Sequence, residues 1–151
     1  MKTILYIDMD NVLVDFKSGL ERVPPEVRKE FGDHPDDIPG IFALMGPMPG
    51  AIEAYRELSW RFDTYVLSTA PWDNPSAWSD KVRWVKTYLG EPAYKRLILT
   101  HHKDLNRGDF LVDDRAKHGA EKFGDGFIQF GSTEFPDWPA VLKHLRAESQ
   151  G

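Results

Sequence analysis

The chain has no cysteine among its 151 residues. Disulfide bonds, thiolate catalysis and zinc sites with cysteine ligands are therefore excluded. A basic run is also missing, and the formal net charge of −5 argues against a surface that holds nucleic acid through its phosphates. No apolar stretch is long enough to cross a bilayer, and the sequence shows neither internal repeats nor low-complexity segments.

The first residues, Met1-Lys2-Thr3, lead directly into an apolar segment, which predicts that no signal peptide is present. Together with the missing cysteines and membrane segments, this predicts a cytoplasmic protein. A chain of this length is sufficient for one domain with a hydrophobic core of its own.

Hydrophobic periodicity predicts strands that alternate with helices. Apolar and β-branched runs predict strands at about residues 3–8, 64–69, 96–100, 110–113 and 127–130. Helical spacing and end signals predict helices at about residues 25–31, 50–61, 76–89, 116–123 and 138–147. Strands separated by helices pair in parallel through right-handed crossovers. The predicted fold is therefore α/β, a three-layer sandwich around a parallel, five-stranded, Rossmann-like sheet.

One long irregular segment, about residues 16–48, interrupts this pattern directly after the first strand. Its position predicts a small helical cap that closes over a site at the end of that strand. The chain is accordingly divided into a catalytic core, residues 1–15 and 49–151, and a cap insertion, residues 16–48.

Two aspartates one residue apart, Asp8 and Asp10, end the first predicted strand. Because side chains alternate along a strand, both carboxylates leave it on the same face, where they repel each other unless a cation or a shared proton intervenes. The carboxyl ends of strands border the ligand crevice of open α/β sheets. Mg²⁺ prefers hard oxygen ligands and exchanges its waters for phosphate oxygens. The pair therefore suggests a magnesium site, although two solvated acids at a turn would look the same.

Three further signals follow in order at the ends of later strands. Thr69 ends the second predicted strand, Lys103 follows the third, and Asp113-Asp114 ends the fourth. A hydroxyl can hold phosphate oxygens, and a lysine can balance phosphate charge. An acid pair that closes a buried strand loses solvation, which a metal ion would offset.

This ordered set resembles the motifs of the haloacid dehalogenase superfamily of phosphotransferases. Within it, the chain is similar to the 5'(3')-deoxyribonucleotidase branch, also called the type C 5'-nucleotidases. The closer resemblance depends on residues 8–16, 47–51, 68–71 and 111–115, and on Lys103 standing ten residues before Asp113.

The resemblance implies a Mg²⁺-dependent phosphomonoester hydrolase that works through an aspartyl phosphate. Asp8 would be the nucleophile. Asp10 would protonate the leaving alkoxide and then take a proton from the attacking water, while its backbone carbonyl binds Mg²⁺. Asp114 would be the second carboxylate on the metal, and Asp113 would orient or support it.

The same resemblance assigns substrate contacts. Thr69 and Lys103 would hold the transferring phosphoryl group. Phe16 matches an aromatic residue that lines the nucleoside pocket, with packing of the insertion as the alternative. Arg115, which completes the acid-pair motif, is counted among the substrate-binding residues.

Some positions depart from the pattern of the resembled branch. Asn11 replaces the common glycine after the second aspartate, and asparagine tolerates a left-handed backbone there. Ala70 stands where a serine is usual, which removes one polar contact. The insertion is also shorter than in the animal enzymes, which leaves nucleotide specificity open.

Three functions remain at this stage. The first is dephosphorylation of (deoxy)nucleoside monophosphates, and the second is the same chemistry on sugar phosphates or other small phosphomonoesters. The third is a signalling receiver domain, which also gathers acids, a hydroxyl and a lysine around Mg²⁺. Receivers place the phosphate-accepting aspartate on a later strand, whereas the third predicted strand here ends in Thr100. A small-molecule phosphomonoester, rather than a nucleic acid polymer or a membrane, is the expected partner, and a homodimer stays open.

The predicted helix at residues 76–89 carries an apolar stripe of Trp78, Val82, Val85 and Leu89, which is expected to face inward. Lys81 on the same helix is interpreted as a solvated lysine, with a contact to the phosphate as the alternative.

Overall fold

The computed structural model describes residues 2–149. Its main sheet is parallel and five-stranded, with the order β5-β4-β1-β6-β7. The strands are β1 (Ile4–Ile7), β4 (Asp63–Ser68), β5 (Leu97–Leu99), β6 (Phe110–Asp113) and β7 (Phe127–Gln129). Two short strands, β2 (Val14–Asp15) and β3 (Gly46–Pro47), form a separate antiparallel pair. The predicted α/β class and parallel five-stranded sheet are confirmed.

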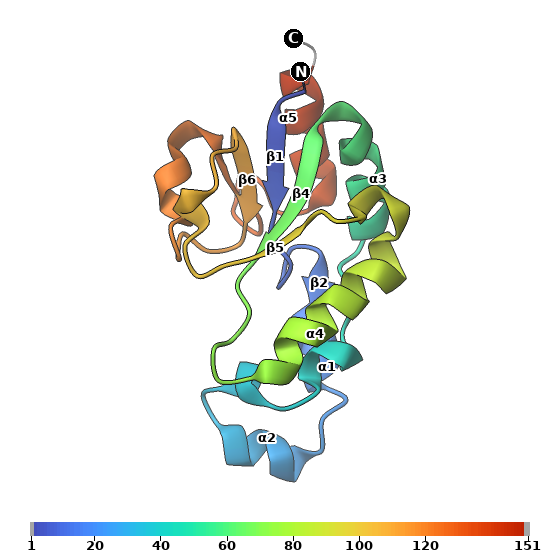
Figure 1. Cartoon of the computed structure of the whole chain (residues 1–151), viewed down its shortest axis with the longest axis vertical. Coiled ribbons are helices and arrows are strands. Elements are labelled where there is room, and N and C mark those ends of the chain that lie inside the picture. The colour runs from blue at the N-terminus through green and yellow to red at the C-terminus, as the bar shows by residue number, and fades with distance from the viewer. Residues whose placement is uncertain (1, 150–151) are drawn as a thin grey trace.

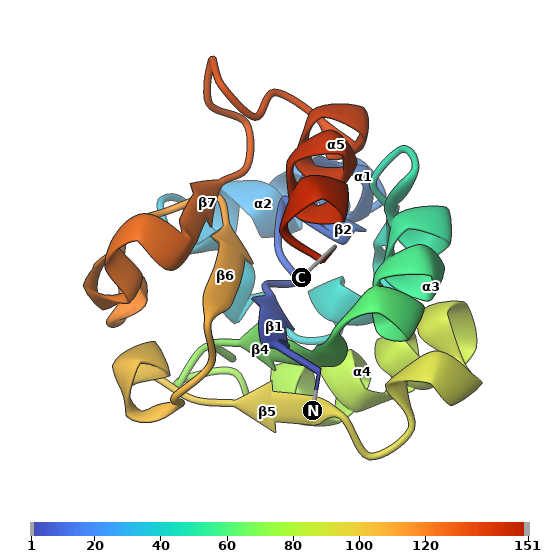
Figure 2. The same cartoon turned by 90° about the horizontal axis from the view of Figure 1, so that it is seen from above.

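Helices flank the sheet (Figures 1 and 2). The longer ones are α3 (Ala51–Arg61), α4 (Pro75–Trp84), which continues as a π-helical turn at Val85–Leu89, and α5 (Trp138–Glu148). Figure 2 shows α3 and α5 side by side, and the two helices are in contact. Within residues 2–149, no helix is both long and apolar enough to span a membrane.

The central strand β1 is buried on both faces. Leu5 and Ile7 belong to the larger hydrophobic cluster, which includes Leu58 of α3 and Leu145 of α5. Tyr6 points the other way into a smaller cluster. Two-sided burial of this kind is typical of central parallel strands, and it fixes the direction in which the chain leaves β1.

The insertion at residues 16–48 lies beyond the carboxyl ends of the strands (Figure 1). It contains α1 (Phe16–Leu20), α2 (Pro25–Phe31) and the 3-10 turns Pro35–Asp37 and Ile41–Leu44. Two buried side chains, one just before α4 and one within it, donate hydrogen bonds to the backbone of the insertion. The Nδ2 atom of Asn74 donates to the carbonyls of Asp36 (2.8 Å) and Ile38 (3.0 Å), and the Nε1 atom of Trp84 donates to that of Met45 (3.0 Å).

Two predicted features are wrong. The helix expected at residues 116–123 is a 3-10 segment at Ala120–Gly126, because His118 and Gly119 adopt positive φ angles of 54° and 90°, which no helix permits. Of the apolar stripe expected on residues 76–89, Val85 and Leu89 are buried as predicted, but the first half of the stripe is displaced. Val82 is 38% exposed and Trp78 is half-buried, whereas the buried face of α4 contains Ala77, Asp80, Lys81 and Trp84.

Candidate active site

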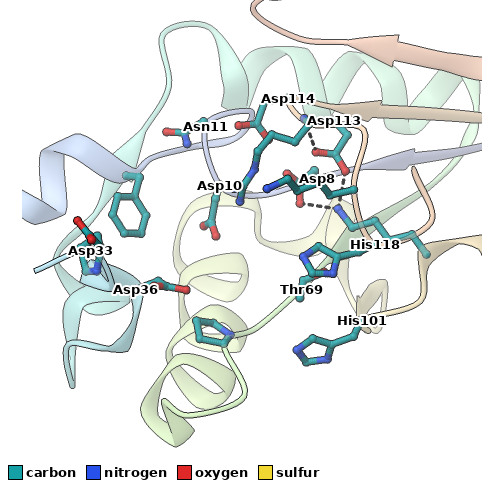
Figure 3. A pocket seen from close by; sticks show the side chains of 16 residues that line it. Asp8, Asp10, Asn11, Asp33, Asp36, Thr69, His101, Asp113, Asp114 and His118 are labelled. Atoms are coloured by element: carbon teal, nitrogen blue, oxygen red, sulfur yellow. Dashed lines mark hydrogen bonds and ion pairs between the residues drawn. The ribbon is translucent and has the colours of Figure 1, made fainter. Parts of the chain in front are cut away.

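All the residues that the sequence predicted for the site line one pocket of about 540 Å³ (Figure 3). These residues are Asp8, Asp10, Phe16, Thr69, Lys103, Asp113, Asp114 and Arg115. The pocket opens between the carboxyl ends of the strands and the insertion. Its location agrees with the rule that ligands of open α/β sheets bind beyond the carboxyl edge.

A tight loop after β1 presents the two aspartates of the first motif. The backbone N–H of Asp8 donates to the carbonyl of Val112 on β6 (2.9 Å). The N–H groups of Val12, Leu13 and Val14 all donate to the carbonyl of Met9 (2.9–3.1 Å). Asn11 completes the turn with a left-handed φ of 62°, as expected from the tolerance of asparagine for this region.

Lys103 is a buried cation between two carboxylates. Its Nζ atom contacts Asp8 Oδ1 at 3.0 Å and Asp113 Oδ2 at 2.6 Å, and the residue is only 3% exposed. Burial lowers the pKa of Lys103, but the charges of Asp8 and Asp113 outweigh this effect, so its pKa is raised. Lys103 therefore stays charged and holds both acids in place.

Three carboxylates converge beside this lysine. Asp8, Asp113 and Asp114 each offer an oxygen that lies within 4.8 Å of the others. Burial and the charge of Asp8 raise the pKa of Asp113 to about 8, and the same two causes raise the pKa of Asp114. One lysine does not balance three acids, so the cluster favours a further cation. Its hard oxygen donors suit a divalent ion such as Mg²⁺.

The two neighbouring aspartates of the last motif have different surroundings. Asp113 accepts hydrogen bonds from Lys103 and from the backbone N–H of Arg115 (3.2 Å). Asp114 is less buried and belongs to the same carboxylate cluster. This arrangement is compatible with a supporting role for Asp113 and a ligand role for Asp114, which stays a prediction.

Asp10 contacts a second lysine, Lys81, whose burial the sequence did not predict. Lys81 is fully buried, and its Nζ atom contacts Asp10 Oδ2 at 3.2 Å and Ser68 Oγ at 2.8 Å. The prediction of a solvated helix lysine is therefore wrong. Burial raises the pKa of Asp10, and the charge of Lys81 opposes that rise.

Thr69 lies at the pocket, but its hydroxyl is already engaged. The Oγ1 atom donates to the carbonyl of Thr100 at 2.7 Å. To donate to a phosphate oxygen, the hydroxyl would have to exchange this bond. Phe16 is half-buried, and its ring meets Phe42 edge-on at a centroid distance of 5.9 Å. Phe16 therefore both packs within the insertion and lines the pocket.

The rest of the pocket wall comes from residues that no strand-end motif marks. The insertion contributes Asp33 and Asp36, and the core side contributes His101, Lys117 and His118. Figure 3 shows Asp33 and Asp36 on one side of the pocket, and His101 and His118 on the other. The insertion therefore adds acidic groups to the wall, and the core adds basic groups beside its own carboxylate cluster.

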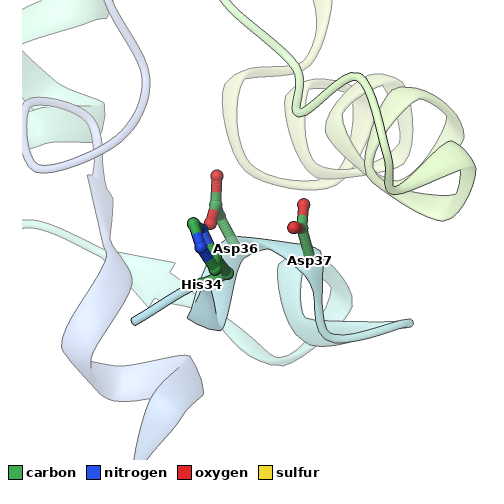
Figure 4. A group of neighbouring side chains, drawn as sticks. All are labelled: His34, Asp36 and Asp37. Atoms are coloured by element: carbon green, nitrogen blue, oxygen red, sulfur yellow. The ribbon is translucent and has the colours of Figure 1, made fainter. Parts of the chain in front are cut away.

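A second group of potential ligands lies on the insertion. His34, Asp36 and Asp37 also bring one ligand atom each to within 4.8 Å of the others (Figure 4). None of these side chains is buried, so solvent screens their charges and no cation is needed to offset them. We assign no metal site to this group.

Fold and site together define a class. The chain superimposes on a haloacid dehalogenase-like hydrolase from Burkholderia xenovorans with a TM-score of 0.59, at 16% identity over 99% of both chains. It also matches a hydrolase of the same kind from Deinococcus radiodurans, solved with bound phosphate and sodium, with a TM-score of 0.53. That match has 15% identity and covers 95% of this chain and 88% of the other. The fold is therefore that of the haloacid dehalogenase-like hydrolases.

Sequence comparison narrows the class to a family. The profile described as 5' nucleotidase, deoxy (pyrimidine), cytosolic type C protein matches residues 17–136. A protein of Vibrio phage KVP40, whose name assigns it provisionally to the 5'(3')-deoxyribonucleotidases, is 54% identical over 99% of this chain and 88% of its own. The human cytosolic 5'(3')-deoxyribonucleotidase is 35% identical over 90% of this chain and 77% of its own. The chain belongs to the type C 5'-nucleotidase family, as its motifs indicated.

This membership makes the protein an enzyme, a phosphoric monoester hydrolase of the 5'-nucleotidase type. The alternative of a signalling receiver domain is thereby wrong. The cluster of Asp8, Asp113 and Asp114 offers hard oxygen ligands that suit a divalent metal cation.

Proposed function

We propose that the protein is a Mg²⁺-dependent 5'(3')-deoxyribonucleotidase that dephosphorylates deoxyribonucleoside monophosphates through a phosphorylated Asp8. The observation that carries the proposal is the convergence of Asp8, Asp113, Asp114 and Lys103 on one pocket. The names of the phage and human relatives support the substrate class.

The metal site comes first in the proposed mechanism. The carboxylates of Asp8 and Asp114 and the backbone carbonyl of Asp10 would hold Mg²⁺. When bound, the ion supplies positive charge that offsets the charge of the phosphate oxygens. Lys103 adds a second, fixed positive charge, and by contacting both Asp8 and Asp113 it offsets the repulsion between them.

Two displacement steps follow. In the first, an Asp8 carboxylate oxygen forms a bond to phosphorus, the bond from phosphorus to the substrate oxygen breaks, and Asp10 gives its proton to that oxygen. In the second, Asp10 takes a proton from water, the water oxygen bonds to phosphorus, and the bond from Asp8 to phosphorus breaks. Asp8 and Asp10 thus return to their starting states, and inorganic phosphate leaves.

The insertion at residues 16–48 is the proposed cap that selects the substrate. A pocket of about 540 Å³ lies within the range of ordinary small-ligand sites. Phe16 would face the nucleoside, with Arg115 on the core side assisting the phosphate. Hydrolysis of sugar phosphates or other small phosphomonoesters by the same core is the second candidate, because the cap is short.

Two finer expectations also belong to the proposal. A cytoplasmic location is supported by the human relative, which is named as a cytosolic enzyme. A homodimer is a further expectation, which sedimentation of the purified protein tests directly.

The test is phosphate release across deoxyribonucleotides, ribonucleotides and sugar phosphates, with Mg²⁺ present. We expect turnover to be highest on deoxyribonucleoside monophosphates and to be lost in Asp8→Asn, which keeps the shape of the side chain without its charge. Asp125→Asn, at an exposed site outside the pocket, is the matched control and should keep full activity.

Two results would contradict the proposal. A preference for sugar phosphates would favour the second candidate and leave the core chemistry intact. Turnover by Asp8→Asn above a small fraction of the wild-type rate would remove Asp8 from the role of nucleophile.

A further inference from the structure

Lys81 occupies an unusual place for a lysine. It lies on α4, is fully buried, and sits on the inner side of Asp10. Asp10 lines the pocket, whereas Lys81 is not among the residues that line it. Lys81 is therefore placed to act on Asp10 and not on a molecule that occupies the pocket.

The carboxyl group of Asp10 has one polar anchor among residues 2–149. Its Oδ2 atom contacts Lys81 at 3.2 Å, while its Oδ1 atom is buried and has no hydrogen-bond partner. The backbone of Asp10 is fixed by a bridge to Val14, but that contact leaves the side chain free to rotate. The direction of the Asp10 carboxyl group therefore depends on Lys81.

Lys81 itself is held from three directions. Its Nζ atom contacts Asp10 after β1, donates to Ser68 Oγ at the end of β4, and lies 4.7 Å from the centre of the Phe42 ring in the insertion. An ammonium group over an aromatic face is attracted by the ring. These contacts hold the ammonium group at one point between the core and the insertion. They also compensate for the unfavourable burial of its charge.

We propose that Lys81 is a positioning residue, which holds the Asp10 carboxyl group where it can pass a proton to the leaving oxygen of the substrate. This inference rests on the proposed function, in which Asp10 is the general acid. It goes further by assigning the control of Asp10 to a lysine on α4 that does not touch the substrate.

The inference predicts a dependence on the leaving group. A deoxyribose alkoxide is a poor leaving group and needs a proton as its bond to phosphorus breaks. The p-nitrophenolate anion is stable and departs without one. The value of kcat/KM reports the first displacement, where this difference acts. Loss of Lys81 should therefore reduce kcat/KM on a deoxynucleotide far more than on p-nitrophenyl phosphate.

The experiment compares Lys81→Met with wild type on dUMP and p-nitrophenyl phosphate. We expect kcat/KM to fall about 100-fold on dUMP, the lower end for a lost general acid, and only about threefold on p-nitrophenyl phosphate. Lys86→Met, at an exposed site just beyond α4, is the control and should match wild type on both substrates. Melting curves establish that each variant is folded.

Asp10→Asn provides a second, independent comparison. It should show the same selective loss, and Lys81→Met added to Asp10→Asn should lower kcat/KM no further, because Lys81 then has no acid to position. Equal losses on the two substrates, or a further loss in the double variant, would overturn the inference. Either result would instead assign Lys81 a purely structural role.

Ser68→Ala decides the question if Lys81→Met does not fold. It removes only the hydroxyl that accepts from Lys81. A smaller loss of kcat/KM that again affects dUMP far more than p-nitrophenyl phosphate supports the inference. A loss of equal size on both substrates contradicts it. A wild-type protein that hydrolyses no nucleotide would refute the proposed function. The inference about Lys81 would be refuted separately if the wild type were active on nucleotides but the variants lost the same activity on both substrates.

Discussion

At the scale of single residues, two buried lysines contact three of the acids that line the pocket. Lys103 contacts Asp8 and Asp113, and Lys81 contacts Asp10. Removing one partner of a buried ion pair leaves the other charge uncompensated, which is strongly unfavourable. Each lysine should therefore affect both the chemistry and the stability of the protein, and through a different aspartate.

The first prediction concerns Lys103. Lys103→Met removes the cation that contacts Asp8 and that, in the proposed mechanism, stabilises the transferring phosphoryl group, so kcat should fall by about 100- to 1000-fold. Lys117→Met is the matched control, because Lys117 lines the same pocket but is exposed, and its kcat should change by less than about threefold. Steady-state kinetics on a deoxynucleotide measure both effects. A kcat for Lys103→Met within tenfold of wild type would contradict the role given to Lys103.

Most of the candidate site residues could be predicted because they lie at or shortly after strand ends, whereas Asp33 and Asp36 of the insertion could not be predicted. Asp8, Asp113 and Asp114 are recognisable because the carboxyl ends of parallel strands meet at one edge of the sheet. Asp33 and Asp36 occupy no such position. Whether their side chains reach the pocket depends on how the insertion packs, and no local pattern in the sequence encodes that.

At the scale of elements, α4 shows why periodicity alone can be misleading. The hydrophobic periodicity predicts that the apolar residues Trp78 and Val82 face the core. The structure instead buries Ala77, Lys81 and Trp84, which also recur at helical spacing. The buried face of a helix is usually apolar, and the buried Lys81 is an exception to this rule. The face of α4 that is buried is therefore less hydrophobic than the face that contains Trp78 and Val82. The signal for Lys81 was its spacing from Ala77 and Trp84.

Part of the secondary structure of residues 16–48 could be predicted from the sequence. The helix at residues 25–31 coincides with α2, because Pro25 at its first position and Gly32 after its end are strong boundary signals. The strands β2 and β3 have two residues each, and their pairing joins Val14 to Pro47 across the whole insertion. Strands of two residues are too short to show a hydrophobic periodicity in the sequence. The two strands meet only once the insertion between them has folded.

The second prediction concerns Phe16 at the start of α1. If its ring stacks on a nucleobase, Phe16→Ala should lower kcat/KM on deoxynucleotides by roughly five- to 100-fold, since such stacking contributes ~1–3 kcal/mol. The loss should appear mainly as a higher KM, and p-nitrophenyl phosphate should be affected much less. Equal losses on both substrates would mean that Phe16 only packs against Phe42 and supports the insertion.

The third prediction concerns the contact between α3 and α5. Hydrogen bonds from Arg146 and Arg61 hold the pKa of Glu57 at about 2, below its ordinary 4.5. A carboxyl whose pKa is lowered by folding contributes stability above its ordinary pKa, and that stability is lost as the pH falls through the folded value. Glu57→Gln should therefore lower the melting temperature at neutral pH by about 2 °C, because the pair is largely exposed.

The pH profile of the melting temperature checks this assignment. The difference between wild type and Glu57→Gln should shrink as the pH falls from about 4.5 to about 2. Glu53→Gln, at an exposed position in the first turn of α3, is the control and should show no such change. A difference that stays constant down to pH 2 would show that the lost stability does not come from the charge of Glu57.

At the scale of the whole molecule, topology assembles the site from distant parts of the sequence. The central place of β1 between β4 and β6 puts Asp8 beside the ends of both neighbouring strands. A parallel sheet of this kind follows from the alternation of strands and helices, so the convergence of the motifs was predictable. The orientation of the insertion was not, because buried contacts such as those of Asn74 and Trp84 determine it.

The convergence of acids has a consequence for the stability of the whole fold. Burial and the charge of Asp8 raise the pKa values of Asp113 and Asp114, so keeping all three carboxylates charged in this cluster is unfavourable. A divalent ion that binds the folded state and not the unfolded chain should offset the repulsion. At 100 times its dissociation constant, such a ligand stabilises a protein by about 2.7 kcal/mol.

The fourth prediction follows from this coupling. EDTA should abolish phosphate release and lower the melting temperature, and added Mg²⁺ should restore both. Ca²⁺ should restore activity poorly, because its looser coordination misplaces the nucleophile. Asp114→Asn should lose most of the Mg²⁺-dependent rise in melting temperature. Asp37→Asn, in the group of His34, Asp36 and Asp37 on the insertion, should keep it. The reverse pattern would place the ion on the insertion, and full activity in EDTA would remove the metal from the mechanism.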